Sequence, residues 1–410
     1  MLRVPYPAAS IQARRSIKVT PIHVATEGTV TATNAAYTNV GSASSPLPAE
    51  DHVFLYSGQA SADNTSRNAF LRLISGATVL GEAGGEGQGS TTSSAYGAGV
   101  LGGVGIVTGD GVNGFQFQAK ANASNYRCGA MCAVAVPISV FGVEGVDWFR
   151  NCTNSGARVV TDAPTGVYTD VINENSWNLG PTAQDWVLLA SYEMDYTNHT
   201  AGRKYLARLL VAGVPTGPIY TKEEEITADV HNVQWAQILS GLSGAVQFQT
   251  QVQSVGTAEV CARRARLILI RRSKWSQILQ AVDAVQDSTL SPTYVDETGL
   301  SISITPWVAD DFAIEIVSTS TATSNVAQPS LKQLWNSTAG TAACIDSGES
   351  LNNVADKPPA WLIRVLQLPA GSTTLVPQIK SANGVATAFF QGRATDPAYH
   401  LVWELRTAGG

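Results

Sequence analysis

The sequence predicts an all-β protein made of tandem antiparallel β-sandwich modules of a jelly-roll-like type, preceded by an extended N-terminal arm. The clearest evidence is residues 245–253, where apolar or Thr side chains alternate strictly with Gln. A period of two places one set of side chains on a core face and the other on a face toward water. Further short apolar runs, separated by Gly-, Ser-, Thr- and Asn-rich segments, indicate many strands joined by turns.

The composition fits a chain that buries most of its sheet surface. The 410 residues suffice for two to four domains at about 100–200 residues each. Only 14% of the residues are charged and 44% are hydrophobic, which argues against a disordered chain. The formal net charge of −6 offers no general attraction to phosphate backbones, and no uncharged apolar stretch reaches the about 18 residues of a membrane span. We therefore expect neither nucleic acid nor a membrane among the partners.

Residues 1–48 are predicted to form the N-terminal arm, because Pro5, Pro7 and Pro21 favour extended backbone and exclude a regular helix. At most two strands are expected there, around residues 17–24. The arm is basic although the chain is acidic, and its cations either form a solvated leader or bind an acidic neighbour. These candidate partner-contact residues are Arg3, Arg14, Arg15 and Lys18.

Three β modules are expected after the arm. We place the first at residues 49–142, the second at residues 143–274 and the third at residues 299–410. Residues 275–298 are predicted to be a linker, and the helical spacing of its apolar residues favours a short helix. Those apolar residues are Trp275, Ile278, Leu279 and Val282.

The first two modules are predicted to be copies of one unit. Both contain, in the same order, an aromatic-rich strand, an Arg-then-apolar strand, a Gln-Phe-Gln strand and a closing apolar strand. Corresponding residues lie 131–136 positions apart, which favours a tandem duplication, with chance similarity between β patterns as the alternative. For the third module only the general pattern matches. The corresponding pairs are Asp51 and Asp185, Arg67 and Arg203, Phe117 and Phe248, and Cys128 and Cys261.

The five cysteines form an odd, scattered set without the paired C-x-x-C spacing of zinc or redox sites. We interpret them as small buried apolar residues. Cys128 and Cys132 are expected on one face of a strand, about 13 Å apart, which is too far for a disulfide. The five histidines are isolated in the sequence, so no metal and no other cofactor is predicted.

Two short motifs have structural interpretations that we favour over functional ones. Residues 97–102 fit G-x-G-x-x-G, but they lie in a Gly-rich connection, residues 81–114, without the strand and helix of a dinucleotide site. Five arginines could form a basic patch, yet they flank an apolar run, as charges at strand ends do, and no aromatic residues alternate with them. The arginines are Arg263, Arg264, Arg266, Arg271 and Arg272.

Five tryptophans lie beside loop-like sequence and have two alternative uses. Sugar-binding sandwiches present Trp for stacking, whereas core or interface packing is the interpretation we favour here. No G-x-S-x-G motif or other catalytic constellation is recognisable, so a non-enzymatic protein is expected. The tryptophans are Trp148, Trp177, Trp235, Trp307 and Trp335.

In composition and closing strands, the chain resembles the structural proteins of tailed-bacteriophage particles, of the head decoration or accessory β-sandwich type. The closing strands are residues 265–271 (Ala-Arg-Leu-Ile-Leu-Ile-Arg) and 399–405 (Tyr-His-Leu-Val-Trp-Glu-Leu). The resemblance implies a virion location, a homo-oligomer such as a trimer, and binding to neighbouring virion subunits such as a major capsid protein. Prolines and arginines interrupt residues 1–16, where a secretory signal needs an unbroken apolar run, so we expect synthesis in the host cytoplasm.

Two other function classes stay open from the sequence. The runner-up is a receptor- or glycan-binding module of a phage tail fibre, spike or adhesin, in which Trp and Asn side chains on loops make the contacts. The third class is a β-sandwich hydrolase with a carboxylate pair assembled from distant parts of the chain. Local sequence selects no such pair.

Overall fold

The computed structural model describes residues 16–26, 30–32, 35–62, 68–86, 99–121, 126–196, 203–224, 230–255, 260–323, 329–335, 342–344, 359–381, 387–390 and 397–408. Regular structure in these residues is almost entirely β-strand, interrupted by three 3-10 turns: η1 (Ile138–Val140), η2 (Arg272–Lys274) and η3 (Thr298–Leu300). The predicted all-β fold is confirmed. The described part of the chain has no helix that is long and apolar enough to cross a membrane.

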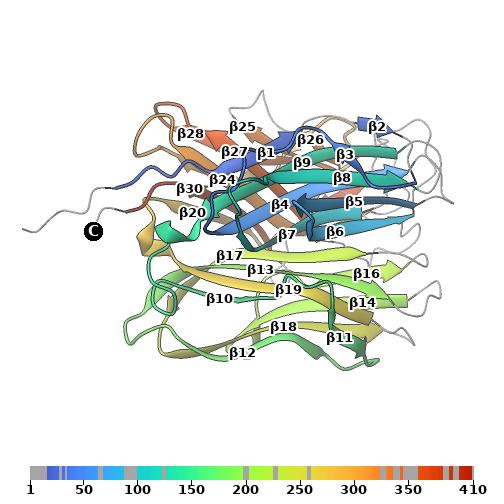
Figure 1. Ribbon diagram of the computed structural model, residues 1–410, viewed down its shortest axis with the longest axis horizontal. Coiled ribbons are helices and arrows are strands. Elements are labelled where there is room, and N and C mark those ends of the chain that lie inside the picture. Colours follow the sequence, from blue (N-terminus) through green and yellow to red (C-terminus); the bar gives the residue numbers. More distant parts are fainter. Residues whose placement is uncertain are drawn as a thin grey trace, which may run out of the picture.

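Three modules repeat one topology along the chain (Figure 1). If the strands of each module are lettered B to I in chain order, one sheet pairs them B-I-D-G and the other C-H-E-F. This is the strand order of a jelly roll, in which two Greek keys form a double-sheet sandwich. We call the B-I-D-G sheets the inner sheets and the C-H-E-F sheets the outer sheets.

Module 1 begins before residue 49, which was its expected first residue. Residues 22–40, expected in the arm, supply its first three strands because their backbone groups pair with β8 and β9. The inner sheet contains β1 (Ile22–Thr26), β2 (Val30–Ala32), β9 (Tyr126–Pro137), β4 (Asp51–Ala62) and β7 (Gly99–Thr108). The outer sheet contains β3 (Thr38–Val40), β8 (Phe115–Ala121), β5 (Asn68–Ser75) and β6 (Thr78–Glu86).

Module 2 contains the strand with alternating Gln, and the structure confirms its two faces. In β18 the apolar positions Val246, Phe248 and Val252 are buried in the core, whereas Gln247 and Gln249 face outward and are partly exposed. The inner sheet contains β10 (Trp148–Cys152), β11 (Arg158–Ala163), β19 (Val260–Arg271), β13 (Gln184–Tyr196) and β17 (His231–Leu242). The outer sheet contains β12 (Thr169–Asn178), β18 (Ala245–Val255), β14 (Arg203–Val211), β15 (Val214–Pro215) and β16 (Tyr220–Glu224).

Module 3 starts within the segment expected to be a linker, and the expected helix there is wrong. Ile278–Asp283 form β20, which pairs with β30, so tertiary pairing overrides the helical spacing of the apolar residues. The inner sheet contains β20, β21 (Asp287–Thr289), β29 (Ala388–Phe390), β30 (Ala398–Glu404), β24 (Phe312–Thr323) and β27 (Pro359–Gln367). The outer sheet contains β22 (Val295–Asp296), β23 (Ile302–Ile304), β28 (Thr373–Ser381), β25 (Pro329–Trp335) and β26 (Ala342–Cys344).

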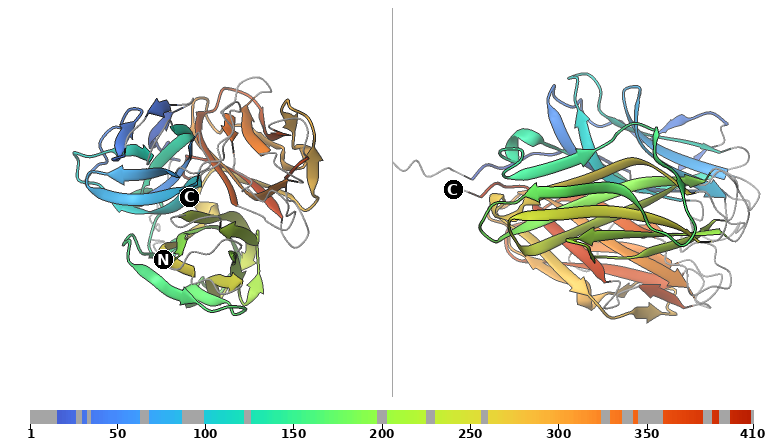
Figure 2. Two further views of the ribbon diagram at one scale, coloured as in Figure 1. Left: turned by 90° about the vertical axis from the view of Figure 1, so that its right-hand side faces the viewer. Right: turned by 90° about the horizontal axis from the view of Figure 1, so that it is seen from below.

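The three modules are arranged around a common centre, as the end-on view in Figure 2 shows. Their inner sheets face this centre, and a single apolar cluster joins side chains from all three. We call this cluster the central core. Each D strand sends alternate residues into it, and their intervening neighbours, such as Phe54 and Leu188, pack in the module's own sandwich. The D-strand residues in the central core are Val53, Leu55, Val187, Leu189, Ile314 and Ile316.

The Gly-rich segment predicted as a connection is partly a central strand. Residues 99–108 form β7, which pairs with β4 along its length. Its glycines face side chains of their own module and of module 2. A Cβ on Gly103 would lie 2.8 Å from Tyr56 Oη and 2.9 Å from Ser191 Oγ, and one on Gly105 would lie 2.7 Å from Phe54 Cε1 and 2.8 Å from Arg266 Cδ. The glycines therefore allow close approach between modules, and the G-x-G-x-x-G match at residues 97–102 overlaps this strand.

The expectation that Cys128 and Cys132 share one face is wrong. In the β4–β9 ladder Ser57 pairs with Cys132 and Gln59 with Gly129, so β9 has one extra residue between these pairs. Such a β-bulge reverses the side-chain alternation beyond it. Cys128 consequently lies in the core of module 1, and Cys132 lies in the central core. A bulge at the corresponding place in β19 puts Arg264 at a positive φ of 46°.

Candidate interaction surfaces

The centre of the molecule is closed by serines at equivalent positions of the three D strands. Ser57, Ser191 and Ser318 each lie opposite a residue of their own module's G strand: Gly102, Gln234 and Trp361. The three serines are therefore equivalent residues of the three modules, and so are the three G-strand residues.

Each of these serines hydrogen-bonds to the G strand of another module, and the three contacts form a ring. Ser191 Oγ accepts from the Val104 N–H at 3.1 Å. Ser57 Oγ accepts from the Ile363 N–H at 3.3 Å, and Ser318 Oγ donates to the Gln234 carbonyl at 3.4 Å. Module 2 thus contacts module 1, module 1 contacts module 3, and module 3 contacts module 2, as expected for pseudo-threefold packing.

The three G-strand positions themselves meet at the centre. Gln234 Nε2 donates to the Gly102 carbonyl at 3.0 Å, and Trp361 Nε1 donates to the Tyr56 carbonyl at 2.9 Å. A Cβ on Gly102 would lie 2.5 Å from Trp361 Cδ1 and 2.9 Å from Gln234 Nε2. One small, one medium and one large residue therefore share a space that three identical residues could not fill in the same way.

The basic cluster of β19 is a structural feature between modules 1 and 2. Arg266 is fully buried and donates to Tyr56 Oη at 3.2 Å, to the Leu80 carbonyl at 2.5 Å and to Asn154 Oδ1 at 3.0 Å. Tyr56 and Leu80 belong to module 1, so this guanidinium holds two modules together.

The remaining arginines of this cluster bind carboxylates of the same chain. Arg263 Nε and Arg264 Nη1 lie 3.0 Å and 2.5 Å from the buried Glu193 carboxylate. Arg271 pairs with Asp147 at 3.1 Å and Arg272 pairs with Asp185 at 2.9 Å. These contacts make the arginines structural, but the expected position at strand ends is wrong for Arg263, Arg264 and Arg266. They lie inside β19, which pairs with neighbouring strands on both edges.

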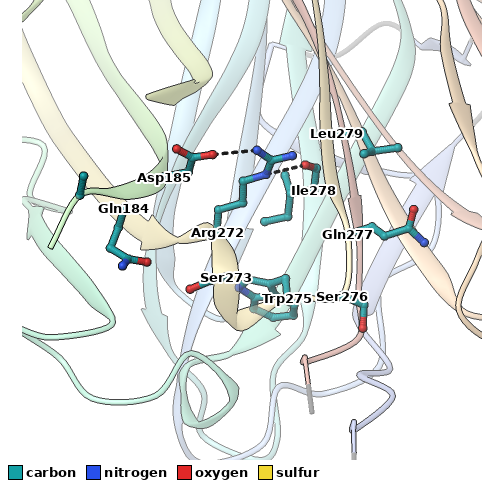
Figure 3. Close-up of a pocket in the computed structure, with 10 residues that line it drawn as sticks. Gln184, Asp185, Arg272, Ser273, Trp275, Ser276, Gln277, Ile278 and Leu279 are labelled. Carbon is teal, nitrogen blue, oxygen red and sulfur yellow. Dashed lines mark hydrogen bonds and ion pairs between the residues drawn. The ribbon is translucent and has the colours of Figure 1, made fainter. Parts of the chain in front are cut away.

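One cavity of about 460 Å³ lies where module 2 passes into module 3. Figure 3 shows Arg272 at its middle, with Nη1 2.9 Å from Asp185 Oδ2 and Nε 2.9 Å from the Ile278 carbonyl oxygen. On another wall, Gln277 Nε2 donates to the Thr305 carbonyl at 2.6 Å. These polar groups of the cavity are thus bound to other groups of the protein, and they help to fix the junction between the second and third modules.

Module 3 has buried ionisable groups that the sequence did not point to. Glu315 and His400 are fully buried, with His400 Nε2 2.9 Å from Glu315 Oε1, and Arg364 donates to the same carboxylate at 2.8 Å. Burial alone would raise the pKa of Glu315, but Arg364 and His400 hold it below its ordinary value. The triad is therefore a charged link inside the sandwich of module 3.

A second group of acids in module 3 contains a carboxyl group whose pKa is raised, in contrast to that of Glu315. Burial raises the pKa of Glu297 to about 9, and Asp287, Asp283 and Asp296 add to the effect. Glu297 is only 4% exposed, so a neutral carboxyl group is favoured there. Across the described residues, no three His, Cys, Asp or Glu side chains are grouped in a way that could hold a metal ion.

The predicted partner-contact residues are only partly within the described structure. Arg3, Arg14 and Arg15 lie outside the described residues. Lys18 is described, and its Nζ donates to the Asp310 carbonyl at 2.6 Å and lies 5.5 Å from the centre of the Phe312 ring. Lys18 is thus bound to module 3 of its own chain.

Most of the tryptophans that were considered for sugar stacking are packed inside. Trp148 and Trp235 are 2% and 0% exposed, and Trp177 stacks on Phe149 at a centroid distance of 5.3 Å in the core of module 2. Trp335 falls among residues whose side chains are outside the description. Trp307 is the exception, because it is 69% exposed.

The outer sheets of modules 1 and 2 share a polar arrangement. In module 1 the Arg72 guanidinium lies 3.8 Å from the Tyr37 ring centre and its Nε donates to Gln118 at 2.9 Å. In module 2 the Arg208 guanidinium lies 3.5 Å from the ring centre of Tyr168, and its Nε donates to Gln251 on the H strand at 2.7 Å. Sequence periodicity predicted the outward Gln row of residues 245–253 in module 2, but not the Tyr and Arg partners.

Comparisons with known proteins give structural likenesses of very low similarity. No protein-family model and no curated protein matches the chain. A solved structure described as the triple jelly roll fold and turret assembly in an archaeal virus is 9% identical, covers 98% of this chain and 99% of its own, and gives a TM-score of 0.18. The infectious bursal disease virus Gx strain structure is 10% identical over 90% of this chain and 80% of its own, with a TM-score of 0.17.

A tandem carbohydrate-binding domain, CBM22-1-CBM22-2 from Paenibacillus barcinonensis Xyn10C, is a third likeness. It is 10% identical, covers 65% of this chain and 98% of its own, and gives a TM-score of 0.17. TM-scores this low carry no information about function. The structure itself is an all-β fold of three jelly-roll modules closed around one centre.

Proposed function

We propose that this chain is a non-enzymatic structural protein of a virus particle, a bacteriophage capsid decoration or accessory protein that binds neighbouring capsid subunits. The single observation that supports it is the ring of three jelly rolls with one central core. Jelly rolls are a recurrent fold of capsid and lectin domains. A rigid body with pseudo-threefold symmetry suits a lattice that repeats around threefold positions.

The proposal changes how an oligomer is expected to form. The sequence suggested a homo-oligomer such as a trimer, whereas here the threefold arrangement is within one chain. The apolar faces that single jelly rolls would use to trimerise are buried in the central core. Further assembly would therefore use the outer sheets or the ends of the modules.

Analysis of purified particles tests this function. Particles from the source are purified on a density gradient, and their proteins are identified by mass spectrometry and located in a cryo-electron microscopy map. The expected result is three-lobed density at the capsid surface, with one jelly roll in each lobe. Absence of the chain from particles that retain their other structural proteins would overturn the proposal.

A second candidate function, glycan or receptor binding, is favoured by the repeated Tyr–Arg–Gln arrangement on two outer sheets. Amide, guanidinium and phenol groups on a partly exposed sheet offer the hydrogen bonds and ring faces that sugars use. A glycan array with the native chain tests this alternative. Binding that is lost in Tyr168→Ala, and retained in Val214→Ser at another exposed site of module 2, would support it.

A further inference from the structure

The loop between strands C and D of module 3, residues 305–311, presents an exposed apolar surface. Trp307 is 69% exposed, Val308 is 46% exposed and Ile17, from the start of the described chain, is 60% exposed. Lys18 links Ile17 to this loop through the Asp310 carbonyl. We call Trp307 and Val308 the Trp307 face, and Ile17 belongs to the chain start that is bound next to this loop.

The loop that presents Trp307 is fixed by hydrogen bonds on both sides. The Trp307 N–H donates to Glu404 Oε1 at 2.7 Å, and the Asp310 N–H donates to the Leu368 carbonyl at 2.8 Å. Asp311 accepts two hydrogen bonds from Arg406, at 2.5 and 2.8 Å. A surface held in one conformation loses little entropy on binding a partner.

Only module 3 has an aromatic residue in this loop. The equivalent loops of modules 1 and 2, residues 41–50 and 179–183, have no Trp, Tyr or Phe. An indole that is 69% exposed gives little to the stability of its own module. Exposed aromatic anchors of this type are enriched at the energetic centres of protein interfaces.

The chain's own N-terminal segment has the chemistry to cover this face. Residues 4–7 read Val-Pro-Tyr-Pro, and proline-containing segments dock on aromatic surfaces by packing their rings. The segment joins the body beside the face, because Ser16 Oγ accepts from Arg406 Nη1 at 3.3 Å. The nine residue steps from Pro7 to Ser16 span about 30 Å when extended, which is enough to reach a neighbouring chain.

We propose that residues 4–7 of one copy bind the Trp307 face of a second copy. This inference rests on the proposed function, because it supplies the contact by which chains in a lattice hold each other. Arg3 directly precedes the segment, and the exposed Asp310 offers it a carboxylate of opposite charge on the second copy.

Sedimentation velocity of the full chain and two complementary variants tests the inference. Trp307→Ser removes the face, and Pro5→Gly with Pro7→Gly removes the segment's rings. The wild-type chain is expected to associate with rising concentration, and each variant to lose at least tenfold in association constant. An equimolar mixture of the two variants should regain one-to-one complexes, because one supplies the intact segment and the other the intact face. Val214→Ser, which removes a side chain that is 62% exposed in module 2, is the matched control.

The outcomes separate this inference from the proposed function. A wild-type chain that stays monomeric, an unchanged association of the Trp307 variant, or a mixture that does not regain complexes would each overturn the inference. If the chain is nevertheless present in purified particles, the proposed function stands without this contact. Because the substituted residues lie on the surface or outside the described body, circular dichroism should show unchanged folding.

Discussion

Gly102 and Trp361 occupy equivalent positions on the G strands of modules 1 and 3, and they touch at the centre of the molecule. A Cβ on Gly102 would lie 2.5 Å from Trp361 Cδ1, closer than side chains normally approach. The indole is fixed by its hydrogen bond to the Tyr56 carbonyl. The glycine is therefore required by a residue about 260 positions away in the sequence.

Gly102→Ala is expected to lower the free energy of unfolding by about 1–3 kcal/mol, because the added methyl group overpacks the centre. Urea denaturation followed by tryptophan fluorescence measures the change. Gly156→Ala is the control, since its nearest neighbour is the end of the flexible Arg264 side chain at 3.2 Å. Equal effects of the two substitutions would contradict the central packing described here.

Arg266→Met is expected to destabilise the chain by about 3 kcal/mol, because it leaves the Leu80 carbonyl and Asn154 without their buried donor. Arg208→Met on the outer sheet of module 2 is the matched control and should cost under about 1 kcal/mol. Chemical denaturation of both variants checks the difference. A loss for Arg266→Met no larger than that of the control would show that modules 1 and 2 are held together by other contacts.

Glu297→Gln is expected to stabilise the protein above neutral pH. The pKa of Glu297 is raised from 4.5 to about 9 in the folded chain, so between these values the folded state keeps a proton that the unfolded state releases. The stability of the wild-type chain therefore falls as the pH rises through this range, whereas Gln needs no proton.

Thermal denaturation measures the effect at several pH values between about 5 and about 8.5, which lie between the unfolded and folded pKa values of Glu297. The gain from Glu297→Gln should reach a few kcal/mol at the upper end and shrink toward the lower end. Glu144→Gln, at a carboxylate that is 48% exposed, should show no such trend. Stability curves of wild type and Glu297→Gln that run parallel across this range would refute the neutral buried carboxyl.

Three cysteines, two of them buried and the third partly buried, are expected to resist thiol reagents in the native protein. Burial raises the pKa of both Cys128 and Cys132 to about 12 and that of Cys152 to about 11, so the reactive thiolate is scarce. Peptide mapping after alkylation should find these three cysteines labelled only in denaturant. Labelling at similar rates with and without denaturant would mean that the modules open readily.

The sequence predicted those elements whose patterns are local. The alternation in residues 245–253 and the separations of 131–136 positions correctly located β18 and the repeated order of strands in the first two modules. Residues 267–270 read as a continuous apolar run because Leu267 and Leu269 face the core of module 2, whereas Ile268 and Ile270 face the central core. The burial of this run on both faces was not predicted from the sequence, because the second face packs against residues of other modules.

The missed features depend on contacts between distant residues. β7 was interpreted as a loop because it is rich in glycine, and those glycines are explained by the close approach of Trp361, Tyr56 and Phe54 rather than by strand propensity. The helix expected after Trp275 is a strand because β30 offers it a pairing edge. Trp307 was among the tryptophans noted in the sequence, but only the folded loop distinguishes it from the buried ones.

The ring of serine contacts among Ser57, Ser191 and Ser318 has a consequence for how such a molecule can evolve. In an assembly of three identical chains, every substitution appears three times, once on each lobe. Here each lobe is encoded by its own stretch of the gene, so a single change alters one outward face and leaves the other two as they were. The molecule can therefore keep a threefold framework while its three flanks acquire different neighbours.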